Sequence, residues 1–80
     1  MASMHARLKR KVRLRSEAFA ERCDALGLST WDSRAKHIGV SAAAMSRLSK
    51  GGAASVNAIT GIVETFGATE AFGELLEVHA

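Results

Sequence analysis

The chain has 80 residues, which is enough for one small domain with a thin core. Eleven Lys and Arg against eight Asp and Glu give a formal net charge of +3, and 48% of the residues are hydrophobic. No apolar run is long enough to span a membrane, and no apolar segment follows the basic N-terminus as it would in a secretory signal. The single cysteine, Cys23, excludes an internal disulfide and suits a reducing compartment. The scattered histidines lack paired ligand spacing, so we expect no metal site.

The two parts of the chain carry opposite charge. All 11 Lys and Arg lie in residues 1–50 beside four acidic residues, whereas residues 51–80 hold four Glu and no Lys or Arg. The first part therefore carries +7 (11 cations less four acids) and the second −4, which together give +3. A strongly basic side indicates a polyanionic partner such as nucleic acid. A solvated basic tail is the alternative, because six of the 11 cations lie in residues 7–15.

The first elements along the chain are a basic segment and a short strand. We expect residues 1–9 to form a flexible arm. Residues 10–15, RKVRLR, alternate between polar and apolar side chains, which is the period of a strand. A helix is the alternative, because Leu8, Val12 and Phe19 also fit helical spacing. We expect the strand, because Ser16 followed by an acidic residue is typical of a helix N-cap and first turn.

Two helices are predicted before the middle of the chain. The first runs over about 17–26, ends at Gly27, and has an apolar face at helical spacing formed by Phe19, Cys23 and Leu26. The second begins after Ser29 or Thr30, either of which can cap it. Its apolar stripe consists of Trp31, Ala35 and Ile38.

The second helix stops at Gly39, and a third helix follows directly. Ser41 caps this third helix, which buries Met45 and Leu48 and stops at Gly51-Gly52. Two helices that cross at a tight turn need a small residue where they approach and a residue free to adopt a positive φ, and Ala35 and Gly39 meet these needs. The arrangement predicts a helix-turn-helix that leaves the outer face of the third helix free to enter a groove.

The last third of the chain predicts a fourth helix and a short fifth one. Ser55 caps the fourth helix, and its apolar stripe is formed by Ile59, Ile62, Val63 and Phe66. Gly61 inside it costs up to about 1 kcal/mol relative to Ala, which indicates a close packing contact. Thr69 caps the fifth helix, which contains Ala71 and Phe72. Residues 74–78, ELLEV, either continue that helix to His79 or form a strand, and we predict that they pair with KVRLR as a small antiparallel sheet.

The segments LGLSTWDSRAKHIGVSAAAMSRLSKG and SVNAITGIVETFGAT resemble the Cro/C1-type helix-turn-helix domain of phage repressors and bacterial regulators, over about residues 16–72. The resemblance implies a mainly α fold, a compact bundle of four or five helices of lambda-repressor-like DNA-binding type. It also implies one domain over residues 1–80, with the helix-turn-helix at about 30–50. The third helix would lie in the major groove of operator DNA, commonly with two copies on a two-fold symmetric site.

This resemblance assigns the DNA contacts to three groups of residues. The base-reading positions are Ser41, Ala42, Ala43, Ser46 and Arg47. The candidate phosphate ligands are Thr30, Lys36, Lys50, Ser55 and Asn57, and the basic arm supplies Arg7, Lys9, Arg10 and Lys11. Arg47 is the base-reading residue able to make a bidentate contact to guanine, whereas the alanines can contact thymine methyl groups.

Two positions depart from the family pattern. Arg34 stands where the family usually has an apolar residue, and Trp31 takes the place of a polar residue that touches a phosphate. We expect Arg34 to lie near the DNA backbone or in solvent, and Trp31 to lie in the core.

The leading hypothesis is a sequence-specific transcriptional regulator, a phage Cro-like repressor of the bacterial cytoplasm or nucleoid. It is expected to have no enzymatic activity, no cofactor, no metal, no small-molecule ligand and no membrane contact. An antitoxin built on the same domain is the closest alternative. A helical protein-interaction module without DNA binding is the alternative from another class, because an acidic protein partner also fits the charge.

Overall fold

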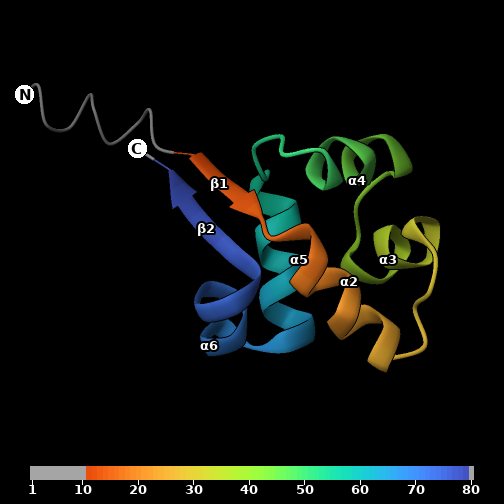
Figure 1. The fold of residues 1–80 in the computed structure, drawn as a ribbon. Helices are drawn as coiled ribbons and strands as arrows, with labels where there is room; N and C mark the ends of the chain where they lie inside the picture. Colours follow the sequence, from red (N-terminus) through yellow and green to blue (C-terminus); the bar gives the residue numbers. More distant parts are fainter. Residues whose placement is uncertain (1–10, 80) are drawn as a thin grey trace, which may run out of the picture.

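The computed structural model describes residues 11–79, and for residue 79 it describes the backbone only. Five helical segments and a two-stranded sheet make up this part of the chain (Figure 1). In chain order the elements are β1 Lys11–Leu14, α2 Ser16–Ala25, α3 Trp31–Ile38, α4 Ala42–Ser49, α5 Val56–Phe66, α6 Ala68–Glu70, the π-helix η1 Ala71–Leu75 that continues α6, and β2 Leu76–His79. The predicted mainly helical bundle with a small sheet is therefore confirmed. The arm residues Arg7, Lys9 and Arg10 lie outside the described residues, as does the rest of the segment 1–9.

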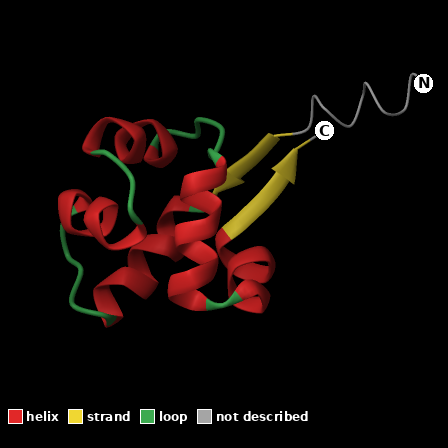
Figure 2. Cartoon of the chain, turned by 180° about the vertical axis from the view of Figure 1, so that it is seen from behind, coloured by secondary structure: helices red, strands yellow, loops and turns green. Residues whose placement is uncertain are grey.

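The two ends of the described chain pair as an antiparallel sheet, as predicted. Val12 lies opposite Val78 and Leu14 opposite Leu76, so these four side chains share one face of the ribbon. The ribbon extends from one side of the helices, and both ends of the described chain lie there (Figure 2). Leu14 and Leu76, at its inner end, are buried against the helices. The alternative prediction, a last helix continued through residues 74–78 to His79, is wrong.

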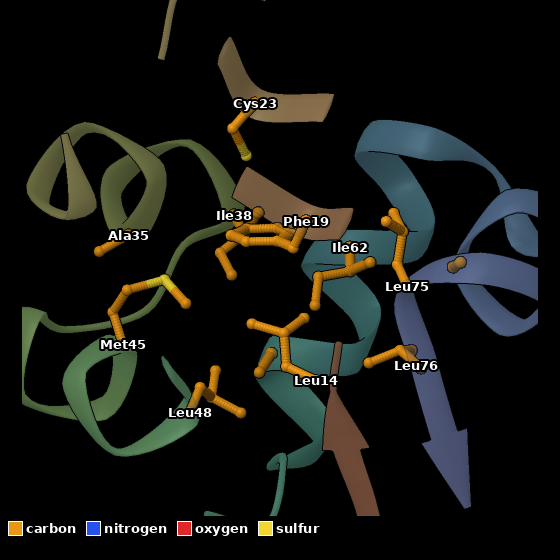
Figure 3. Close-up of a cluster of buried hydrophobic side chains, with 12 residues drawn as sticks. Leu14, Phe19, Cys23, Ala35, Ile38, Met45, Leu48, Ile62, Leu75 and Leu76 are labelled. Atoms are coloured by element: carbon orange, nitrogen blue, oxygen red, sulfur yellow. The ribbon is translucent and has the colours of Figure 1, made fainter. Parts of the chain in front are cut away.

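The core lies where α2, α5, η1 and the inner end of the sheet meet α3 and α4 (Figure 3). Phe19 on α2 is fully buried, and its ring lies edge-on to Phe66 with centroids 6.1 Å apart. The close contact predicted at Gly61 is present: a Cβ there would clash with the carbonyl oxygen of Ile38. This approach of α5 to the end of α3 fixes the position of the helix-turn-helix on the rest of the domain.

Three hydroxyl caps are found at the predicted helix starts. Of the two candidates before α3, Thr30 is the cap, and its Oγ1 accepts a hydrogen bond from the Ser33 amide at 3.1 Å. The Oγ atoms of Ser41 and Ser55 accept from the third residue of α4 and of α5, at 3.1 and 3.2 Å. Each cap satisfies one of the amides that a helix start leaves without an intrahelical partner.

The prediction for the start of α2 is wrong. Ser16 is the first residue of the helix rather than its cap, because its hydroxyl donates to the carbonyl oxygen of Ser49 at 3.0 Å, at the end of α4. The helix ends at Ala25 with Leu26 as its C-cap, and Gly27 follows with a φ of 80°, so the predicted stop at Gly27 is confirmed. Leu26 itself is 54% exposed, so the prediction that it lies on the buried face is wrong.

The C-terminal helical turns also differ from the prediction. Thr69 caps nothing, because α6 begins at Ala68 directly after Gly67, which has a φ of 89°. The π-helical turn that follows directs Ala71 and Leu75 into the core and leaves Phe72 exposed. None of the helices between residues 11 and 79 has the length and apolarity that crossing a membrane requires.

Candidate nucleic-acid interface

The turn between α3 and α4 has the geometry that the sequence predicts for a helix-turn-helix. Gly39 adopts a φ of 82°, and its amide and that of Val40 both donate to the carbonyl oxygen of Ala35, at 2.9 and 3.0 Å. The backbone of residue 35 thus closes the end of α3, while its methyl side chain, 1% exposed, leaves room for α4 to pack against it. A larger side chain or a residue that avoids positive φ would open this crossing.

The outer face of α4 is exposed along its whole length. Met45 and Leu48 are buried beneath it, which fixes which side of the helix faces outward. The five predicted base-reading residues all lie on the exposed side: Ser41, Ala42, Ala43, Ser46 and Arg47. Within the described part of the chain, neither the Arg47 guanidinium nor the Ser46 hydroxyl has a hydrogen-bond or ion-pair partner. Both groups are therefore available to a ligand.

The predicted phosphate ligands are exposed as well, but some of their side chains already make contacts within the protein. The Thr30 and Ser55 hydroxyls already cap α3 and α5; the Ser55 O–H remains able to donate to a phosphate, whereas the Thr30 O–H donates to Ser33 Oγ at 3.0 Å. Lys36 lies 3.9 Å from Asp32 on the same helix face, a contact worth a few tenths of a kcal/mol in solvent. Lys50 follows α4 directly, and Asn57 lies in the first turn of α5.

The strand β1 runs beside the loop that joins α4 to α5. Arg13 forms an antiparallel bridge with Ala53, and the Ala54 amide donates to the Val12 carbonyl at 2.7 Å. The loop thereby brings Lys50 to the same side of the molecule as the cations of β1. Lys11, the arm residue that is described, is exposed at the start of this strand. Arg13, which the sequence analysis did not single out as a contact, has a buried Nε without a hydrogen-bond partner in the described structure.

Acidic residues are absent from the middle of the sequence. Between Asp32 and Glu64 the chain holds four cations and no Asp or Glu, and this segment supplies α4, both of its flanking turns and the start of α5. The acidic Glu70 and Glu74 lie on α6 and η1, on the other side of the molecule from α4 (Figure 1), where both contact Arg22. Two of these four cations, Arg47 and Lys50, lie on α4 and directly after it, so a polyanion approaching α4 meets these two positive charges.

The structure corrects two predictions about α3. Arg34 is 5% exposed rather than close to DNA or solvent, and its Nη2 donates to Asp24 Oδ1 at 2.7 Å. Trp31 is 38% exposed rather than a core residue, although its ring stacks on that of Phe19 at a centroid distance of 6.2 Å. Sequence reasoning missed this arrangement. The signal was an arginine on the inner stripe of α3, with an acidic residue one helix earlier to pair with it.

Cys23 is the buried thiol of the core. Burial raises its pKa above the ordinary value, an effect that the nearby Arg34 charge partly opposes. A thiol that resists ionisation is a poor nucleophile and a poor metal ligand. Among the described residues, no group of three or more His, Cys, Asp or Glu side chains is placed to hold a metal ion, and no pocket is present.

Comparison with known proteins adds no assignment. A scan against protein-family models found no match, and neither a search of the curated proteins nor one of the solved structures found a match.

Proposed function

We propose that the protein is a sequence-specific, double-stranded DNA-binding transcriptional regulator that inserts α4 into the major groove. One observation carries the proposal. The outer face of α4 is exposed, free of acidic residues, and carries an unpartnered forked cation, Arg47, above a buried Met45 and Leu48. An α-helix fits the major groove, and arginine matches the two acceptors of guanine there.

The flanking groups support the same orientation. Capped helix starts at α3 and α5 and the cation Lys50 at the end of α4 surround this face. Such groups bind phosphates without base preference and fix the register of a recognition helix on the duplex. This function requires no catalytic group, metal or cofactor, so we propose a non-enzymatic repressor-type regulator, at work in the bacterial cytoplasm or nucleoid.

The proposal includes a second copy of the chain, bound to the same DNA site. The outer face of α4 offers one long donor, one hydroxyl and two methyl groups, which discriminate few base pairs. Two copies on a two-fold symmetric site double the number of base pairs that are recognised. We therefore propose that the protein binds its operator as a pair of domains.

Two linked experiments test the proposal. Selection of bound duplexes from a random library is expected to return a consensus with two-fold symmetry. The affinity for that duplex is expected to fall with salt, because each phosphate that is neutralised adds about −0.9 to the slope of log affinity against log salt. A slope near zero, or a library that returns no consensus, would contradict the regulator and favour a protein-interaction module.

A further inference from the structure

Among residues 11–78, Arg34 is the only charged residue that is buried. Its Nε donates to the carbonyl oxygen of Leu28 at 2.9 Å, and its Nη2 donates to Asp24 Oδ1 at 2.7 Å. Its guanidinium carbon also lies 4.5 Å from the centroid of the Trp31 ring. These three partners belong to the end of α2, to the connecting loop and to the first residue of α3, so one planar group joins three consecutive segments.

The Trp31 ring continues this chain of contacts into the core. It stacks on Phe19, which is fully buried, with an angle of 16° between the ring planes. The indole is thereby held on Phe19 and close to the Arg34 guanidinium, although 38% of the residue stays exposed. Thr30, the residue directly before it, carries a cap shared with Ser33 and is a candidate phosphate ligand. The position of Thr30 relative to the core therefore depends on the contacts of Arg34 and Trp31.

We propose that Arg34 is a positioning residue for DNA binding. It holds the loop 26–30 and Trp31 in place, so that the first amides of α3, directly after Thr30, meet a phosphate while α4 lies in the groove. The inference rests on the proposed function. Arg34 does not itself touch DNA, because its side chain is buried beneath the loop. It acts through Leu28 and Trp31.

The chemistry of the site points to positioning rather than to stability. Only Arg34 of this ion pair is buried, because the Asp24 side chain is 59% exposed, so a hydrophobic side chain of similar volume at residue 34 leaves the carboxylate in solvent and creates no uncompensated buried charge. Such a side chain would leave the Leu28 carbonyl without its donor, however, and would remove the guanidinium from Trp31. Arginine is required here because its planar fork reaches a carbonyl and a carboxylate at the same time, which a lysine ammonium does not.

The test compares Arg34→Met and Arg34→Lys with the unsubstituted protein on the selected duplex, over a range of salt concentrations. We expect Arg34→Met to keep the melting temperature but to lose about tenfold in affinity, the worth of one charged hydrogen bond. Its salt slope should fall in magnitude by about one, for one lost phosphate contact. Arg34→Lys keeps the charge without the fork and should restore neither quantity. Full recovery in Arg34→Lys would show that charge alone acts and would overturn the proposal.

Arg22→Met is the matched control. It removes one charge from a paired arginine whose partners Glu70 and Glu74 lie on α6 and η1, so it should leave affinity and slope nearly unchanged. An equal loss in this control would also overturn the positioning role, because it would assign the effect to net charge.

The free protein provides a separate measurement. Trp31 is the only tryptophan in the chain, so its fluorescence reports on this site alone. We expect Arg34→Met to change its emission and to speed amide exchange at Leu28 and Ser33 without affecting α5. Unchanged exchange and emission would overturn the positioning claim while leaving duplex binding intact. Failure of the unsubstituted protein to bind any duplex would instead overturn the proposed function and the phosphate role with it.

Discussion

At the scale of single residues, Gly61 determines how closely two helices approach. A Cβ at this position would meet the carbonyl oxygen of Ile38, which is backbone and cannot rotate away. Ile38 is the last residue of α3, and Gly39 and α4 follow it directly. A group as small as one methyl at residue 61 therefore disturbs both the core and the placement of α4.

Gly61→Ala is expected to destabilise the domain strongly. Overpacking of this kind costs about 1–3 kcal/mol or more, and each kcal/mol lowers the melting temperature of a domain of this size by about 4–8 °C. Gly73→Ala is the control, because a Cβ at Gly73 meets nothing within 4 Å and its φ is not positive. Thermal melts followed by circular dichroism check the pair, and equal melting temperatures for the two variants would contradict the packing argument.

Arg47 and Lys50 are expected to contribute differently to DNA binding. Loss of a bidentate contact in Arg47→Ala should cost about 1–3 kcal/mol of discrimination at one base pair of each half-site. Lys50→Ala should weaken binding to all sequences alike and reduce the salt slope by about one. Both side chains are exposed, so neither change should lower the melting temperature. Binding to single-base variants of the selected site measures the difference. An equal loss for every variant site in Arg47→Ala would make Arg47 a phosphate ligand.

At the scale of elements, only the inner end of the two-stranded sheet is packed against the helices. Leu76 is 2% exposed, whereas Val78, two residues further along the same face of β2, is 60% exposed. The ion pair between Arg15 and Glu77, 3.5 Å apart and partly exposed, adds little to stability. The sheet is therefore held mainly by the leucines that it inserts beneath the helices.

Leu76→Ala and Val78→Ala should thus have unequal effects on stability. Removing the buried leucine is expected to lower the free energy of unfolding by about 2–5 kcal/mol, which is a large part of what a small domain has. The exposed valine should change it by less than about 0.5 kcal/mol. Urea unfolding of both variants gives the comparison. Similar losses in the two would mean that strand pairing, rather than burial, holds the sheet.

The elements that could be predicted from the sequence are those set by local chemistry. Thr30, Ser41 and Ser55 cap their helices because the acceptor and the amide lie three residues apart, and Gly39 ends α3 because it adopts a positive φ. The errors arose where a distant contact decides. Ser16 bonds to a carbonyl 33 residues away, and Arg34 is buried because the end of α2 and its loop supply its partners. The five residues proposed to read bases share one exposed face because the spacing of Met45 and Leu48 already fixed which side of α4 is inward.

At the scale of the whole molecule, charge is separated along the domain. The helix α4 and the residue after it, with Arg47 and Lys50, lie on one side of the molecule, while α6 and η1, whose Glu70 and Glu74 contact Arg22, lie on the other. A separation of this kind orients a protein on a polyanion before any specific contact forms, and it raises the association rate at low salt. The proposed regulator would therefore approach DNA with α4 foremost.

The measurement that most directly tests the proposed binding mode is a map of backbone amide chemical shifts as the selected duplex is added to the protein. The account predicts that the largest changes fall in α4, at the starts of α3 and α5 and in β1. Small or no changes are expected in α6 and η1. Changes confined to α6, η1 and the outer end of β2, with α4 unaffected, would contradict it.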